Sequence, residues 1–152
     1  MNVQEFLRQR DIPFRSLDHE PAYGAQSVAQ AVHISGEQVA KPVLLKAGDS
    51  HALAVVPATH TIDLAAAARA LGVAKVELAS EEECGRMFAD CELGALPPFG
   101  SQYGVRTLMD RMLLEDEEIV FEGNTHHEAI RMRLKDYASL EQPSVARFSR
   151  HV

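Results

Sequence analysis

The sequence predicts one α/β domain of the α+β type, in which helices cover a mixed, partly curled and mainly antiparallel β-sheet. Three observations support this prediction. Some segments place apolar residues at helical spacing, whereas others alternate them with polar residues. Hairpin signals outnumber the crossovers that a parallel sheet needs. The 152 residues are 46% hydrophobic and 24% charged, which suffices for one core, so residues 1–152 are expected to fold as a single domain.

The first part of the chain predicts two helices and a hairpin. Residues 3–10 are amphipathic and end where a proline follows. Residues 27–35 begin with Ser27 and Gln30 at the spacing of a capping box, which predicts a second helix. Residues 41–58 carry apolar runs on both sides of a Gly-Asp turn and give the clearest hairpin signal.

The middle of the chain predicts two further helices. Residues 63–72 and 80–88 begin with the capping residues Asp63 and Ser80. Residues 75–79, between them, predict a strand.

The last part of the chain predicts a strand-rich half with a terminal helix. Strands are expected at residues 105–110, 117–123 and 128–134, because apolar and polar residues alternate there. Residues 134–143 predict a helix that a proline ends. Residues 129–152 are locally basic, and a solvated edge strand with a tail explains them as well as a contact with RNA does.

The net charge of −7 argues against a protein that coats nucleic acid through bulk electrostatics, so no DNA partner is expected and RNA would need a local basic patch. The chain has no apolar run long enough to span a bilayer and no signal-like segment, so no membrane partner is expected and the cytoplasm is the expected location. Cys84 and Cys91 fit neither a redox pair nor a zinc site.

Metal and cofactor motifs are missing from the sequence. Among the seven histidines, His126 and His127 are adjacent, so in a strand they face opposite sides. No zincin pattern, serine nucleophile elbow, phosphate-binding loop or dinucleotide fingerprint occurs. We therefore predict no metal and no cofactor.

Lys41 is the first candidate for chemistry. It places an ammonium group at the start of an apolar strand, where a lysine gains nothing from packing its charge. A cation held there binds a phosphate or polarises a carbonyl. The alternative is a lysine at a sheet edge that extends its charge into water.

The segment Gly-Ala-Leu-Pro-Pro-Phe-Gly, residues 94–100, is the second candidate, and we call it the proline loop. Pro97 and Pro98 make it stiff, and its backbone donors include those of Gly94, Ala95 and Leu96. Such a loop reads a small polar ligand through main-chain N–H groups, with Gly94 permitting close approach. An ordinary loop joining two strands is the alternative.

The turn at residues 123–126 is the third candidate. It offers Asn124, Thr125 and His126 at one end of two expected strands. His126 is a candidate hydrogen-bond donor to a hydroxyl group, or a proton shuttle. A simple hairpin turn is again the alternative.

Together these segments resemble the aminoacyl-tRNA deacylase domain family, also called the YbaK and prolyl-tRNA synthetase-associated domain. The resemblance rests on residues 19–64, 91–100 and 117–137, in the order and approximate spacing of the family. It implies a trans-editing hydrolase that deacylates mischarged aminoacyl-tRNA at the 3′-terminal ester. The implied partners are the acceptor end of a mischarged tRNA and an aminoacyl-tRNA synthetase.

The resemblance also implies which residues form the site. Lys41 and Gly94 are implied as catalytic residues, with the loop backbone polarising the ester carbonyl and no side chain acting as the nucleophile. The residues implied to bind substrate are Ala95, Leu96, Pro97, Phe99, Gly123, Asn124, Thr125 and His126. Two departures from family members, Pro42 after Lys41 and the absence of a His-Pro turn, leave the edited amino acid open.

Two other functions stay open on the sequence. One is a non-catalytic module of the same fold that binds a ligand or a protein. The other is a hydrolase for a different small ester or amide.

Overall fold

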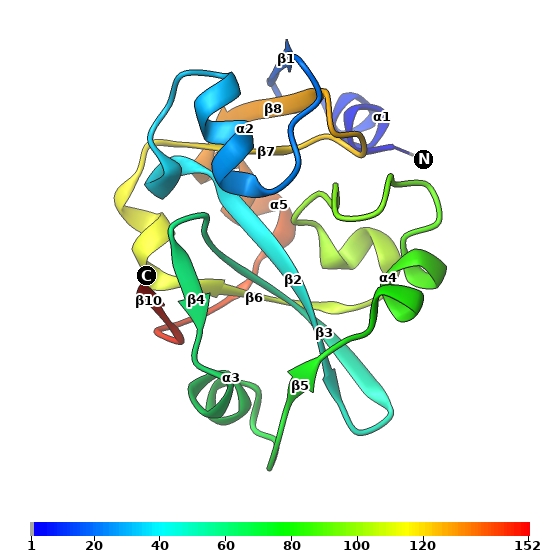
Figure 1. The fold of residues 1–152 in the computed structure, drawn as a ribbon, viewed down its shortest axis with the longest axis vertical. Coiled ribbons are helices and arrows are strands. Elements are labelled where there is room, and N and C mark those ends of the chain that lie inside the picture. The colour runs from blue at the N-terminus through cyan, green and yellow to red at the C-terminus, as the bar shows by residue number, and fades with distance from the viewer. Residues whose placement is uncertain (1) are drawn as a thin grey trace.

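A long central hairpin organises the structure, a computed structural model that describes residues 2–152 (Figure 1). The hairpin lies in a five-stranded sheet with the order β5-β2-β3-β6-β9. Its strands are β2 (Ala40–Ala47), β3 (Ser50–Pro57), β5 (Glu77–Leu78), β6 (Arg106–Asp110) and β9 (Ser144–Ala146). The β3–β6 and β6–β9 pairs are parallel and the others are antiparallel, so this sheet is mixed.

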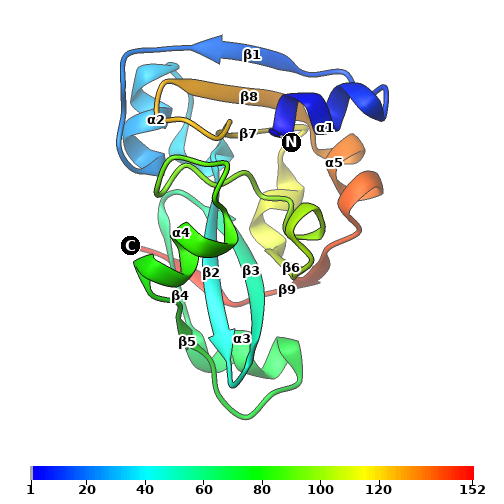
Figure 2. The same ribbon diagram turned by 90° about the vertical axis from the view of Figure 1, so that its right-hand side faces the viewer.

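Two smaller antiparallel sheets accompany it. One has the order β1-β8-β7, from β1 (Arg15–Asp18), β7 (Glu118–Glu122) and β8 (Glu128–Arg133). The other pairs β4 (His60–Ile62) with β10 (Ser149–His151). The three-stranded sheet lies across one end of the β2–β3 hairpin (Figure 2).

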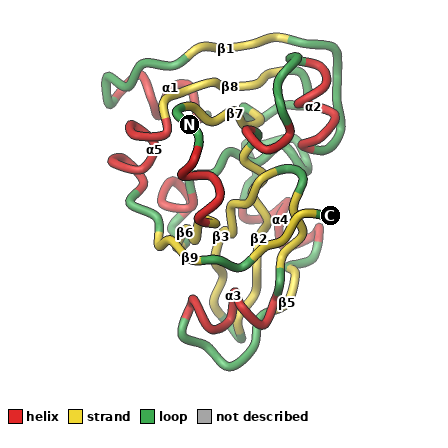
Figure 3. Tube along the Cα trace, turned by 90° about the vertical axis from the view of Figure 1, so that its left-hand side faces the viewer, coloured by secondary structure: helices red, strands yellow, loops and turns green. Residues whose placement is uncertain are grey.

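Across residues 2–152, five short helices and three 3₁₀ turns connect and cover the sheets. The helices are α1 (Val3–Gln9), α2 (Ala25–Ala31), α3 (Leu64–Leu71), α4 (Glu81–Met87) and α5 (Leu134–Glu141). The 3₁₀ turns are η1 (Gly36–Gln38), η2 (Gly100–Tyr103) and η3 (Arg111–Glu115). Figure 3 shows α3 at the end of the hairpin that lies away from β1 and β8. Within residues 2–152 no helix has both the length and the apolar character needed to cross a membrane.

Four apolar clusters hold these layers together. The largest joins α1, α5 and the inner faces of β7 and β8 around Phe99. A second packs α3 on one face of the hairpin, and a third packs α2 against β7 and β8. In the fourth, Leu44 and Leu53 of the hairpin meet Phe88 and Leu96, so the proline loop lies over the face opposite α3.

The predicted fold class is confirmed, with corrections to particular elements. The second helix begins at Ala25, not at Ser27, because Gly24 with φ 94° is its N-cap and no side chain caps it. The capping-box prediction for Ser27 and Gln30 was therefore wrong. The expected single sheet is divided into three within residues 2–152, and β1, β4, β9 and β10 were missed because each has only three or four residues.

Other local predictions are confirmed. Asp63 caps α3 through the Ala66 N–H, and Gly72 ends it in the left-handed conformation. Ser80 and Glu83 form the expected capping box of α4. The proline loop connects α4 with η2, so the alternative in which it joins two strands was wrong.

The Tyr137 hydroxyl fixes the proline loop to α5, which leads to a prediction about stability. Tyr137 is fully buried and donates a hydrogen bond to the Pro98 carbonyl at 2.6 Å. Tyr137→Phe leaves that buried carbonyl without its donor, so the free energy of unfolding should fall by about 1–3 kcal/mol in urea titrations. The control Tyr23→Phe changes an exposed ring and should leave it within about 0.5 kcal/mol. Equal effects of the two variants would contradict this role of the hydroxyl.

Candidate active site

The proline loop and strand β2 enclose a cavity of about 350 Å³, which we call the loop cavity. Strand β2 approaches it with Pro42, Val43 and Leu44, because its 41–43 edge is unpaired on the side away from β3 within residues 2–152. The remaining lining residues come from β5, α4 and the segment that enters the proline loop: Leu78, Ala79, Glu81, Cys84, Leu93, Gly94 and Leu96. Glu81 is the one charged residue in this lining, so the cavity is mainly apolar.

The backbone donors of the proline loop fall into two groups. The Ala95 N–H donates to the Glu92 carbonyl at 2.9 Å, and the Gly100 N–H donates to Thr107 Oγ1 at 2.9 Å. By contrast, the N–H groups of Gly94 and Leu96 donate to no atom of the described chain. Both of these residues line the loop cavity.

The far end of the loop is built into the core. Phe99 is fully buried and packs against Phe6, Phe121 and Tyr137 at ring-centroid distances of 5.4, 5.7 and 5.0 Å. Its side chain therefore anchors the loop and has no surface to offer a substrate. Ala95 and Pro97 are also buried, whereas Gly94 is exposed with φ 87°.

The turn at residues 123–126 contacts the segment that leads into the proline loop, as the resemblance to the family implied. Asn124 is buried, and its side chain accepts a hydrogen bond from the Val3 N–H at 2.9 Å and donates one to Cys91 Sγ at 3.2 Å. Its backbone carbonyl accepts a hydrogen bond from the Glu92 N–H at 2.8 Å. Asn124 thus fastens α1 to the segment before the loop. Gly123 packs against Ile130, and the Thr125 hydroxyl is buried without a partner in the described chain.

His126 lies directly beside the loop entrance. Its Nε2 is 2.7 Å from the Leu93 carbonyl oxygen, and its Nδ1 is 3.3 Å from Glu122 Oε1. The Tyr23 ring packs on the imidazole with centroids 4.6 Å apart. Burial raises the pKa of Glu122 to about 7, and His126 limits that rise.

Lys41 lies next to the loop cavity and not in its lining. Its Nζ donates to the His60 carbonyl at 2.7 Å, and burial lowers the pKa of the ammonium. It lines a second cavity of about 250 Å³ on the α3 side of β2. Val43 and Leu78 line both cavities, so the two adjoin at the free edge of β2.

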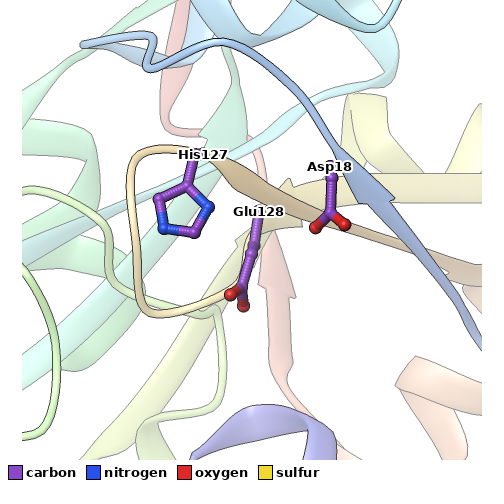
Figure 4. A group of neighbouring side chains, drawn as sticks. All are labelled: Asp18, His127 and Glu128. Atoms are coloured by element: carbon purple, nitrogen blue, oxygen red, sulfur yellow. The ribbon is translucent and has the colours of Figure 1, made fainter.

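One cluster of side chains has the composition of a metal site. Asp18, His127 and Glu128 bring one ligand atom each to within 4.8 Å of one another, from β1, the turn before β8 and the first residue of β8 (Figure 4). Asp18 and Glu128 are direct cross-strand neighbours. These groups could hold a divalent cation, but Asp18 and His127 are exposed to water, which satisfies such groups without a metal, and we assign them no role.

These features define the class of protein as an α+β domain with an apolar ligand cavity, backbone donors on one side and a cation near its rim. Comparison with known proteins makes this more specific. The family model of the aminoacyl-tRNA editing domain matches residues 19–140. The chain belongs to this family.

Individual relatives agree with this membership. The chain is 28% identical over 149 residues to the multifunctional Ser/Thr-tRNA deacylase ProXp-y of Escherichia coli strain K12, across 95% of this chain and 89% of that protein. A crystal structure of a candidate trans-editing enzyme for prolyl-tRNA synthetase has a TM-score of 0.86 at 24% identity, covering 97% of this chain and 94% of that one. A hypothetical protein of known structure has a TM-score of 0.89 at 18% identity, covering 97% and 99%. The two structures show a shared fold.

Sequence reasoning missed several residues that shape the site. Glu81 was not singled out, because an acidic residue in the first turn of a helix is explained by the helix dipole, and yet it lines the loop cavity. Glu92 gave no signal, because the His126 N–H that it accepts from lies 34 positions away in the sequence. Glu122 gave none because the burial of its carboxyl depends on how the layers pack. Cys84 was considered only for a redox pair or a zinc site, and yet it lines the cavity.

The buried Glu122 carboxyl generates a prediction about stability and pH. The folded protein holds its proton to about pH 7, against an ordinary pKa of 4.5. Its contribution to stability is therefore fully present below pH 4.5 and is lost as the pH rises to about 7. Relative to Glu122→Gln, the wild-type protein should lose at most ~1.4 kcal/mol per pH unit in this window, measured by urea unfolding.

The matched control is Glu82→Gln on the exposed side of α4. Its difference from the wild-type protein should not change across the same pH window. A difference between the wild-type protein and Glu122→Gln that is also constant would show that Glu122 ionises normally.

Proposed function

We propose that this protein is a trans-editing hydrolase that deacylates mischarged tRNA by hydrolysing the 3′-terminal aminoacyl ester. One observation carries the proposal: Gly94 and Leu96, whose N–H groups donate to no atom of the described chain, line a mainly apolar cavity that adjoins the cavity of Lys41. Membership in the aminoacyl-tRNA editing family supports it, as does the relative named as a Ser/Thr-tRNA deacylase.

The chemistry follows from these donors. Water attacks the ester carbonyl carbon, the bond to the ribose oxygen breaks, and the products are a free amino acid and a tRNA with its terminal hydroxyl restored. Negative charge develops on the carbonyl oxygen, and preorganised N–H donors at Gly94 and Leu96 stabilise it. Because a substrate ribose hydroxyl and the loop orient the water, no side-chain nucleophile is needed.

The two adjoining cavities divide the substrate between them. The aminoacyl group occupies the loop cavity, where the apolar lining selects the side chain by size and Glu81 is available to its ammonium group. The terminal nucleotide crosses the free edge of β2, and Lys41 neutralises its phosphate. Lys41 leaves the His60 carbonyl in order to make this contact.

The proposed partners are the acceptor end of the tRNA and an aminoacyl-tRNA synthetase. With a net charge of −7, the protein has little general attraction for RNA, so we expect its contacts with tRNA to be limited to the acceptor end. The cytoplasm, where tRNA is charged, is the proposed location.

A panel of mischarged tRNAs tests the activity. Purified protein is incubated with tRNAs that carry Ala, Ser, Thr or Cys, and loss of the ester is measured against the uncatalysed rate. Lys41→Ala should lower kcat/KM by about tenfold or more, because it removes the cation at the phosphate. Lys46→Ala, which removes another lysine of β2 that does not line either of these two cavities, should have little effect.

The outcomes separate the candidate functions. No turnover of any substrate by the wild-type protein would leave the non-catalytic binding module as the explanation. Turnover of aminoacyl-adenosine as fast as that of whole tRNA would favour a hydrolase for small esters.

Gly94→Val tests the backbone donors. A Cβ at Gly94 meets only His126 Cε1, at 3.6 Å, so space is not the obstacle. The obstacle is the φ of 87°, because a β-branched residue with this φ costs roughly 1–3 kcal/mol of strain and shifts the backbone. Turnover should fall by about 10²-fold as a donor moves away, while circular dichroism stays native.

Gly48→Val is the matched control for this strain. Gly48 also has positive φ, at 62°, but it lies in the β2–β3 turn and outside the loop cavity. Gly48→Val should destabilise the protein about as much as Gly94→Val does, and it should leave turnover intact. If Gly94→Val retains full turnover, the loop is an ordinary connection.

A further inference from the structure

The peptide unit between Leu93 and Gly94 carries both an occupied acceptor and a free donor. Its carbonyl oxygen is 2.7 Å from His126 Nε2, and its N–H has no acceptor in the described chain. This peptide bond is trans, as are the others in the described part of the chain, so the two groups of this planar unit point in opposite directions. Whatever holds the carbonyl toward His126 therefore also directs the Gly94 N–H away from His126. Gly94 itself lines the loop cavity.

The hydrogen bond to the carbonyl requires a proton on His126 Nε2, because a carbonyl oxygen only accepts. In the neutral imidazole Nδ1 is then an acceptor, and it faces Glu122 Oε1 at 3.3 Å. A protonated Glu122 carboxyl satisfies Nδ1 by donating to it. The equivalent arrangement places that proton on the imidazole, opposite an ionised Glu122.

Loss of this one proton leaves the two hydrogen bonds of His126 with only one donor between them. With Glu122 ionised and His126 neutral, the single ring N–H serves either the carboxylate or the Leu93 carbonyl. At the other contact, the unprotonated ring nitrogen then directs its lone pair at an oxygen atom, which is repulsive. Because Glu122 is buried with 5% of its surface exposed, water does not relieve this conflict at the carboxylate.

We propose that Glu122 and His126 are positioning residues that share one proton, and that this proton holds the Leu93–Gly94 peptide with its N–H directed at the loop cavity. The catalytic consequence, alignment of that N–H with the ester carbonyl, rests on the proposed function. The orientation of the peptide does not.

Two other titratable side chains lie against the pair. Glu92 accepts from the His126 backbone N–H at 2.7 Å, and its charge raises the pKa of Glu122. The Tyr23 ring covers the imidazole at 4.6 Å and is 72% exposed. Glu92 belongs to the segment that also fixes Ala95, so it is kept unchanged in the test.

Nuclear magnetic resonance of the wild-type protein tests the orientation without any substrate. The ¹⁵N shifts of His126 should show a proton on Nε2 while the pair holds the shared proton, and the Gly94 amide resonance should change as the pair loses it. In Glu122→Gln the carboxamide N–H donates to Nδ1 at every pH, so the Gly94 titration should disappear. A Gly94 resonance that does not titrate, or that titrates equally in both proteins, overturns the proposal.

Kinetics test the catalytic consequence. His126→Phe keeps a ring but removes the donor, so kcat should fall by about tenfold or more, with KM changed by less than about threefold. Wild-type kcat, after subtraction of the uncatalysed rate, should fall as the pH rises through the midpoint seen for Gly94. Glu122→Gln should keep its kcat above that midpoint.

His127→Gln is the matched control, because it alters the adjacent and exposed histidine. It should leave kcat and the pH profile unchanged. If the wild-type protein turns over no mischarged tRNA, the proposed function fails while the Gly94 titration still decides the orientation. If turnover is present and His126→Phe retains it, the positioning role fails alone.

Discussion

The fixed shape of the proline loop depends on its attachment to the hydrophobic core. Phe99 fills the space between α1, β7 and α5, and the buried Tyr137 hydroxyl holds the Pro98 carbonyl. With this end immobile, the two prolines restrict the backbone toward Leu96. The N–H groups at the cavity are therefore held in place before any ligand arrives, which is the condition under which backbone dipoles stabilise developing charge.

The entrance of the loop is held by a different kind of interaction. Asn124 and His126, from the turn between β7 and β8, bind the segment at Glu92 and Leu93 through polar contacts. Apolar burial fixes one end of the loop and a titratable hydrogen-bond pair fixes the other. The site thus combines a rigid frame with one peptide unit whose orientation depends on a proton.

Sequence and structure agree best where the determining contacts are local. The hairpin at residues 41–58, the Asp63 cap and the capping box of α4 all depend on residues within a few positions of each other. The three candidate segments also lie near one another, as their resemblance to one family implied. The sequence did not predict the roles of individual residues in these segments. Phe99 is buried in the core, and Lys41, at the position of the family's lysine, faces the α3 side of β2.

The sequence by itself determined the fold class, the stiffness of the proline loop and the glycine that permits its positive φ at Gly94. These follow from residue type and short-range geometry. Only the tertiary structure decided that His126 contacts a carbonyl 33 positions earlier and that His60 meets Ser149 at a separation of 89 residues, which brings β10 to β4. Such partners are chosen by how the layers pack, and no local pattern encodes them.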